Sequence, residues 1–106
     1  MRAKPVGAAA LLQLNRVVHE PARLAILTIL AAAEQADFKF IQEATGLTKG
    51  NLNAHATKLE EAGYVTVLKC VRGKVLVTRY RLTAEGRRAI EQYRSNLFAG
   101  LLRSRR

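Results

Sequence analysis

The spacing of apolar residues changes at Gly63 from a helical period to a strand period, and this change constrains the fold more than any other feature. Two β-rich segments follow it, Tyr64–Val71 and Val75–Leu82, and Arg72-Gly73-Lys74 separates them. Two such segments joined through a glycine form a β-hairpin. The segments on either side keep helical spacing, so the sequence predicts a mainly helical protein that carries one hairpin.

Helical periodicity and cap residues place helices around this hairpin. The predicted helices are Ala8–Val18, Pro21–Ala33, Lys39–Thr45, Lys49–Ala62 and a last helix that Thr83 caps and that continues through Leu101 and Leu102. Ala36–Phe40 is expected to be a short linker or a single rung of strand. The helix Lys39–Thr45 is expected to turn Phe40, Ile41 and Ala44 inward. Gly46 suits the end of the third helix, and a side-chain oxygen on Thr48 suits the start of the fourth.

Two helices joined by a turn that contains glycine form a helix-turn-helix. A hairpin with a basic tip after the second of these helices makes the unit a winged helix. The predicted fold class is therefore mainly α with a small β-hairpin wing (α+β), extended by additional N- and C-terminal dimerisation helices. The length of 106 residues fits a single domain over 1–106, with 1–7 and 103–106 expected to be flexible.

Positive charge points to the class of partner. Lysine and arginine outnumber aspartate and glutamate by 18 to 8, which gives a net charge of +10. The C-terminal Arg103, Arg105 and Arg106 account for only part of this excess. An excess of this size favours a polyanion, with nucleic acid first and an anionic membrane surface second.

The sequence also argues against several classes of protein. The only cysteine, Cys70, has no partner for an internal disulfide, and we expect it at the edge of the core. Together with His19 and His55 it makes no recognised zinc spacing, so we predict neither metal nor cofactor. The apolar stretch Ala25–Ala33 is too short to span a bilayer, and we expect a cytoplasmic protein. No catalytic constellation stands out, so the chain is not expected to be an enzyme.

Four runs of sequence resemble a known family. They are Gly46-Leu-Thr-Lys-Gly-Asn-Leu-Asn-Ala-His55, Leu59-Glu-Glu-Ala-Gly-Tyr-Val65, Thr78-Arg-Tyr-Arg-Leu-Thr-Ala-Glu-Gly86 and, upstream, His19-Glu-Pro-Ala-Arg-Leu-Ala-Ile-Leu27. In this order they resemble the small winged-helix transcriptional regulators related to the MarR and ArsR families, over roughly residues 15–95. The resemblance implies a homodimeric regulator that binds double-stranded DNA. It leaves open an unidentified small-molecule effector at the dimer interface, and the metal-sensing motifs of some relatives are missing here.

A helix in this position lies in the major groove, with its N-terminal residues at the base edges. Asparagine suits adenine and lysine suits guanine, while Gly50 either lets the backbone approach a phosphate or sits in a frayed first turn. The contacts predicted for the recognition helix 48–62 are Thr48, Lys49, Gly50, Asn51, Asn53, His55 and Lys58. The wing, residues 71–75, is expected on the flanking minor groove or backbone through Arg72, Gly73 and Lys74, with Arg79 added from the returning strand.

The first and last helices carry apolar stripes that a small core of three helices cannot cover. We expect a shared dimer interface, and packing of the two helices within one chain is the alternative. The predicted interface residues are Leu11, Leu14, Val18, Tyr93, Leu97, Phe98 and Leu101. A two-fold dimer predicts a pseudo-palindromic DNA site.

The sequence therefore predicts a sequence-specific transcriptional regulator. Repression by blocking polymerase is the simplest mechanism, and activation stays open. A non-specific architectural DNA-binding protein is one alternative, and a winged helix that serves protein contacts is another.

Overall fold

The computed structural model describes residues 6–103, and within them the side chains of residues 8–102. The elements in chain order are α1 (Val6–Leu11), α2 (Pro21–Ala33), β1 (Gln35–Asp37), α3 (Phe38–Thr45), α4 (Lys49–Glu61), β2 (Val65–Arg72), β3 (Val75–Leu82) and α5 (Ala84–Arg103). The predicted flexibility of the ends concerns mostly residues outside this range, although 6, 7 and 103 are helical.

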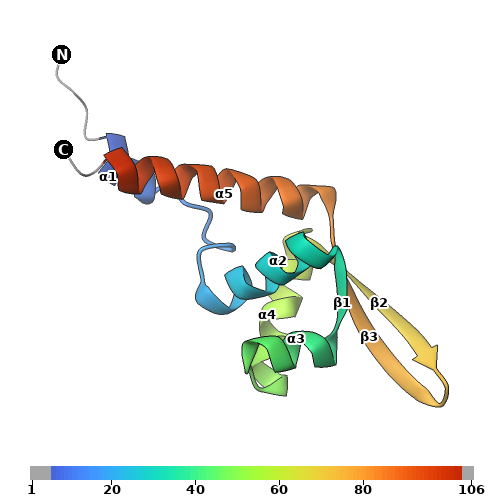
Figure 1. Cartoon of the computed structure of the whole chain (residues 1–106). Coiled ribbons are helices and arrows are strands. Elements are labelled where there is room, and N and C mark those ends of the chain that lie inside the picture. The colour runs from blue at the N-terminus through green and yellow to red at the C-terminus, as the bar shows by residue number, and fades with distance from the viewer. Residues whose placement is uncertain (1–5, 104–106) are drawn as a thin grey trace.

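Figure 1 shows three regions of the molecule. Helices α2, α3 and α4 gather into a compact bundle beside the sheet, and the hairpin β2–β3 extends away from them. Helix α5 crosses the bundle and runs beyond it, and the short α1 lies beside its C-terminal half. This arrangement is the predicted winged helix with additional terminal helices.

The sheet is antiparallel and places β3 in the centre, in the order β1-β3-β2. The hairpin register runs from Val65 opposite Leu82 to Arg72 opposite Val75, which leaves a two-residue turn. Gly73 begins that turn at φ 66°, a conformation that glycine adopts without steric cost. On the other edge, Gln35–Asp37 pairs with β3 and forms the short strand that the sequence allowed.

The hydrophobic core joins the helices to the sheet. Its most deeply buried large side chains come from the loop before α2 and from α2, α3 and α4: Val18, Ile26, Leu27, Leu30, Ile41, Leu52 and Leu59. Leu82 and Tyr80 close it from β3, and burial, followed by the nearby Glu60 carboxylate, raises the pKa of the Tyr80 phenol. Apolar burial on this scale is the main force that holds the helices and the sheet together.

The first helix is shorter than predicted. It ends at Leu11 instead of Val18, and residues 12–20 form turns. The Asn15 side-chain oxygen accepts hydrogen bonds from the amides of Val17, at 2.9 Å, and Val18, at 3.2 Å. An asparagine that bonds to the backbone in this way competes with the helix, which explains the early end.

The inward face predicted for the third helix was wrong in part. Ile41 is buried, but Phe40 is 54% exposed and Ala44 is exposed. The helix begins at Phe38, because the Asp37 carboxylate caps it through the amide of Phe40. Phe38 and Ile41 then share the inner face, three residues apart, and Phe38 packs on the Tyr80 ring.

Three residues predicted for a dimer interface lie inside the chain instead. Leu14, Val18 and Tyr93 are 7%, 0% and 5% exposed. The loop 12–20 folds back onto α5, where Nδ1 of His19 lies 2.8 Å from the Tyr93 hydroxyl. These three side chains are therefore core residues. For them the alternative stated above, packing within one chain, holds in place of a dimer interface. Leu11 and Leu97 are half-buried, and Phe98 and Leu101 stay exposed.

Cys70 is exposed, so its expected place at the core edge was wrong. It lies opposite Val77, and two further residue pairs separate it from the turn of the hairpin. Within residues 6–103 no group of His, Cys, Asp or Glu side chains could hold a metal ion. No described helix combines the length and hydropathy needed to cross a membrane.

Candidate nucleic-acid interface

Helix α4 is held by its ends and by its inner face. The Thr48 side chain accepts a hydrogen bond from the amide of Asn51, as predicted for the N-cap. Gly46, at φ 76°, ends α3 in the left-handed region and turns the chain toward α4. Leu52 and Leu59 are fully buried. These anchors leave the opposite face of α4 free of the core.

The outer face of α4 carries most of the residues predicted for DNA contact. Six of the seven are exposed, namely Thr48, Lys49, Gly50, Asn51, Asn53 and Lys58. Ala54 and Thr57 are also exposed among these residues, and the sequence analysis did not include Ala54 on this face. Positions 50, 54 and 57 stand opposite the buried positions 52, 56 and 59, so counting at 100° per residue would have found it.

His55 is the predicted contact that the structure places elsewhere. Its Nδ1 atom lies 3.2 Å from Nη1 of Arg23 and 3.7 Å from Oε1 of Glu20, at the side of α4 next to α2. A guanidinium only donates, so Nδ1 accepts this hydrogen bond and carries no proton. The expectation that His55 faces solvent with the other contacts was wrong, because position 55 lies at the border of the buried face.

Arg23 connects α4 to the loop before α2. Its Nε atom donates to the carbonyl of Val17 at 2.6 Å, and Nη2 donates to the carbonyl of Arg16 at 3.3 Å. The third bond goes to His55. The planar guanidinium can serve all three acceptors at once, which the ammonium of a lysine cannot do in the same geometry.

We expect Arg23→Ala to lower the free energy of unfolding by about 2 kcal/mol, since hydrogen bonds from a charged group contribute about 1.5–3 kcal/mol each and solvent screens part of this. Urea unfolding followed by circular dichroism measures the loss. Arg16→Ala removes the same charge from an exposed side chain and serves as the control. Equal losses in the two variants would contradict the role given to Arg23.

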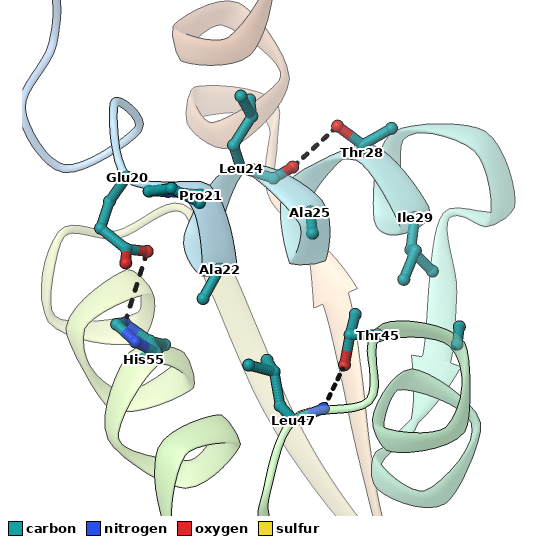
Figure 2. A pocket seen from close by; sticks show the side chains of 11 residues that line it. Glu20, Pro21, Ala22, Leu24, Ala25, Thr28, Ile29, Thr45, Leu47 and His55 are labelled. Atoms are coloured by element: carbon teal, nitrogen blue, oxygen red, sulfur yellow. Dashed lines mark hydrogen bonds and ion pairs between the residues drawn. The ribbon is translucent and has the colours of Figure 1, made fainter.

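An apolar groove lies beside this polar cluster. Figure 2 shows Leu24, Ala25 and Ile29 of α2 on one side and Leu47, from the turn before α4, on the other. Oε1 of Glu20 and Nδ1 of His55, which lie 3.7 Å apart, stand at one end. The groove flanks α4 on the side that His55 occupies and does not include the exposed residues of the outer face.

The wing presents its tip to solvent and keeps Arg79 at its base. Arg72, Gly73 and Lys74 are exposed at the tip, as expected. Arg79 is only half-exposed, because β3 is the central strand and Arg79 lies between Asp37 and Leu68. The sequence analysis added Arg79 to the wing contacts and did not predict that β1 pairs beside it.

Lys39 is a further cation that sequence reasoning missed. It is exposed in the first turn of α3 and lines the same groove as Lys49 and Arg72. Nothing in the local pattern around Lys39 distinguishes it from an ordinary surface lysine. Its neighbours at this groove come from two other elements.

Comparison with known proteins gives three results. A family model described as "Winged helix DNA-binding domain" matches residues 22–100. An uncharacterized protein of Methanocaldococcus jannaschii is 35% identical over 78 residues, which cover 74% of this chain and 85% of that protein. A solved structure of a transcriptional regulator homologue from Pyrococcus horikoshii OT3 superposes with a TM-score of 0.78 at 30% identity, over 82% of this chain and 86% of the other.

Proposed function

The chain belongs to the family of winged helix DNA-binding domains, and we propose that it is a sequence-specific regulator that binds its DNA site as a homodimer. Double-stranded DNA is the partner of this fold class, and the family agrees with the prediction that the chain is not an enzyme. A specific site, a repressor role, two-fold symmetry and a cytoplasmic location are the finer parts of the proposal.

The outer face of α4 is the observation that carries it. Lys49, Asn51 and Asn53 are exposed there, on a helix whose inner face is anchored in the core. A rigid helix with amide and ammonium groups on its free face suits the donor and acceptor pattern of the major groove. Asn51 and Asn53 are proposed to read adenine, and Lys49 to reach guanine.

Gly50 supports close approach of this face to DNA. A methyl group added at Gly50 would meet no atom within 4 Å, and the residue does not have a positive φ. The fold therefore does not require glycine at this position, although glycine costs about 1 kcal/mol against alanine inside a helix. Close approach of the helix backbone to a DNA phosphate would explain why glycine stands at position 50.

The dimer is proposed to form through the distal part of α5. Phe98 and Leu101 are 60% and 54% exposed there, and the following Leu102 is 56% exposed. Leu12, which comes directly after α1, is also exposed. The radius of gyration is 16.4 Å, against about 13 Å for a compact domain of this size. An elongated monomer with an apolar end is consistent with burial of that end against a second copy.

The experiment is fluorescence anisotropy of the purified protein on duplex DNA from its own upstream region, with a shuffled duplex beside it, across a salt series. We expect the protein to prefer the upstream duplex to the shuffled duplex by at least about 10³-fold. Equal and steeply salt-dependent binding to both duplexes would favour a non-specific architectural protein. The net charge of +10 is the feature that supports this alternative. Absence of binding at low salt would exclude both DNA functions and favour protein contacts.

A further inference from the structure

The apolar groove beside α2, called the α2 groove below, includes none of the residues proposed above to contact DNA. Its volume is about 970 Å³, and small-molecule sites in proteins have volumes of about 300–1,000 Å³. Figure 2 shows that its walls come from α2, from the end of α3, from the turn before α4 and from α4 itself. A molecule bound there would therefore touch both helices of the helix-turn-helix.

Most of the lining of the α2 groove is apolar. Seven of the eleven lining residues have purely hydrocarbon side chains, of which Leu24, Ile29 and Leu47 are the largest. Thr28 and Thr45 add little polarity, because each hydroxyl donates to a carbonyl of its own helix, at 2.7 and 2.8 Å. The groove therefore suits the apolar body of a ligand, whose burial favours binding.

One end of the α2 groove carries a negative charge, that of the Glu20 carboxylate. His55 beside it is neutral, because its Nδ1 atom accepts the hydrogen bond from Arg23 and carries no proton. Among the side chains of residues 8–102, no lysine or arginine forms an ion pair with Glu20. The Glu20 side chain is 31% exposed, so a ligand can reach a carboxylate that has no cationic partner.

We propose that the α2 groove binds a small organic cation with an apolar body. The ammonium group of the ligand donates to the Glu20 carboxylate, and its hydrocarbon part lies against Leu24, Ile29 and Leu47. Oε1 of Glu20 already accepts from the Arg23 amide at 2.8 Å, which leaves the second carboxylate oxygen for the ligand. An anion would be repelled at this end of the groove, although the chain as a whole carries a charge of +10.

This site lies within one protomer and beside α4, so it differs from the effector site at the dimer interface that the family resemblance leaves open. It goes beyond the proposed function and does not depend on DNA binding. Its ligand is defined by one charge complementary to Glu20 and by an apolar part that fits the groove.

The test is calorimetric titration of the full chain with phenylbutylammonium. Phenylbutanol and phenylpentanoate serve as the neutral and the anionic probe with the same apolar body. We expect the cation to bind about tenfold more tightly than the alcohol, because a hydrogen bond to a charged group at a half-buried site contributes about this much. The anion should bind more weakly than the alcohol.

Glu20→Gln should abolish the preference for the cation and leave the affinity for the alcohol unchanged. Glutamine keeps a side-chain oxygen for the Arg23 amide, so the cap of α2 is expected to persist, and circular dichroism checks this. Glu43→Gln is the matched control, since it removes the same charge from an exposed position of α3 outside the groove. It should keep the wild-type preference.

A second variant and a spectrum localise the ligand. Ala25→Leu adds bulk to the wall of the groove and should weaken binding of the cation and of the alcohol alike. In amide NMR spectra, phenylbutylammonium should shift the signals of Leu24, Ala25 and Leu47 in the wild type and in Glu43→Gln.

Three results would overturn the proposal. Equal affinity of the wild type for the cation and the alcohol would remove the role of the charge. A preference that survives in Glu20→Gln would place the cation elsewhere. Absence of binding of phenylbutylammonium at about 10 mM would exclude the site, since a probe of this size should bind at millimolar concentration. None of these measurements uses DNA, so each failure leaves the proposed function standing.

Discussion

Replacing Gly86 by alanine is expected to lower the free energy of unfolding by about 3 kcal/mol and the melting temperature by more than about 10 °C. A methyl group at this position would meet the carbonyl oxygen of Tyr64 and would lie 2.8 Å from Cδ1 of Leu82. A backbone carbonyl cannot move aside as the end of a flexible side chain can. The added carbon must therefore push α5 away from the start of β2.

The surrounding hydrogen bonds oppose such a shift. The Thr83 hydroxyl donates to the Gly63 carbonyl at 2.7 Å and accepts from the Gly86 amide at 2.9 Å. The Thr83 amide donates to the carbonyl of Tyr64 at 3.0 Å. Displacement of α5 would strain these bonds as well as the apolar contact, so the loss should exceed that of a single overpacked methyl.

Gly50→Ala is the matched control, measured by thermal and urea unfolding. The added methyl at Gly50 has open space, so we expect no loss of stability and a gain of up to about 1 kcal/mol. The same variant should bind DNA more weakly if the backbone at Gly50 approaches a phosphate. Equal melting temperatures for the Gly86 variant and the wild type would show that the junction of β2 and α5 can adapt.

If the proposed dimer forms, Phe98→Glu should convert it into a monomer and reduce affinity for the preferred duplex by at least about 100-fold. The Phe98 side chain is 60% exposed at the apolar end of α5, and a carboxylate buried against a second copy would be strongly unfavourable. A dimer joins two half-site contacts, and that joining contributes about 10²–10⁴ in apparent affinity. Light scattering gives the mass, and anisotropy gives the affinity.

The control for this variant is Gln92→Glu, which adds the same charge at an exposed position of α5 outside the apolar end. It should keep the mass and the affinity of the wild type. A wild type that is monomeric at the concentrations where it binds specifically would contradict the dimer. Retention of the wild-type mass by Phe98→Glu would instead move the interface away from α5.

The helix-turn-helix and the wing were predictable because short-range interactions determine them. Gly46 ends α3, and Thr48 caps α4 through an amide three residues away. Gly73 forms the hairpin turn in the same local way. The period of apolar residues then identifies the buried face of α4, since Leu52 and Leu59 recur at helical spacing. Each of these features depends on neighbours in the sequence alone.

The tertiary structure decided what depends on distant residues. His55 forms a hydrogen bond with Arg23, 32 positions away, and His19 forms one with Tyr93, 74 positions away. Asn15 ends the first helix early, and its amide bonds to the hydroxyl of Tyr64, 49 positions along the chain. A periodic pattern indicates that a residue lies on a given helix face or near a helix end. It does not identify the distant residue that forms a hydrogen bond with it.

The sequence by itself therefore determined the order of elements, the recognition helix and the basic tip of the wing. The fold alone decided that Leu14, Val18 and Tyr93 belong to the core and that Phe98 and Leu101 remain exposed. It also brought Lys39 to the same groove as Arg72. The physical reason is that local hydrogen bonds and side-chain period act over a few residues, whereas burial and groups of charges depend on how separate elements pack in space.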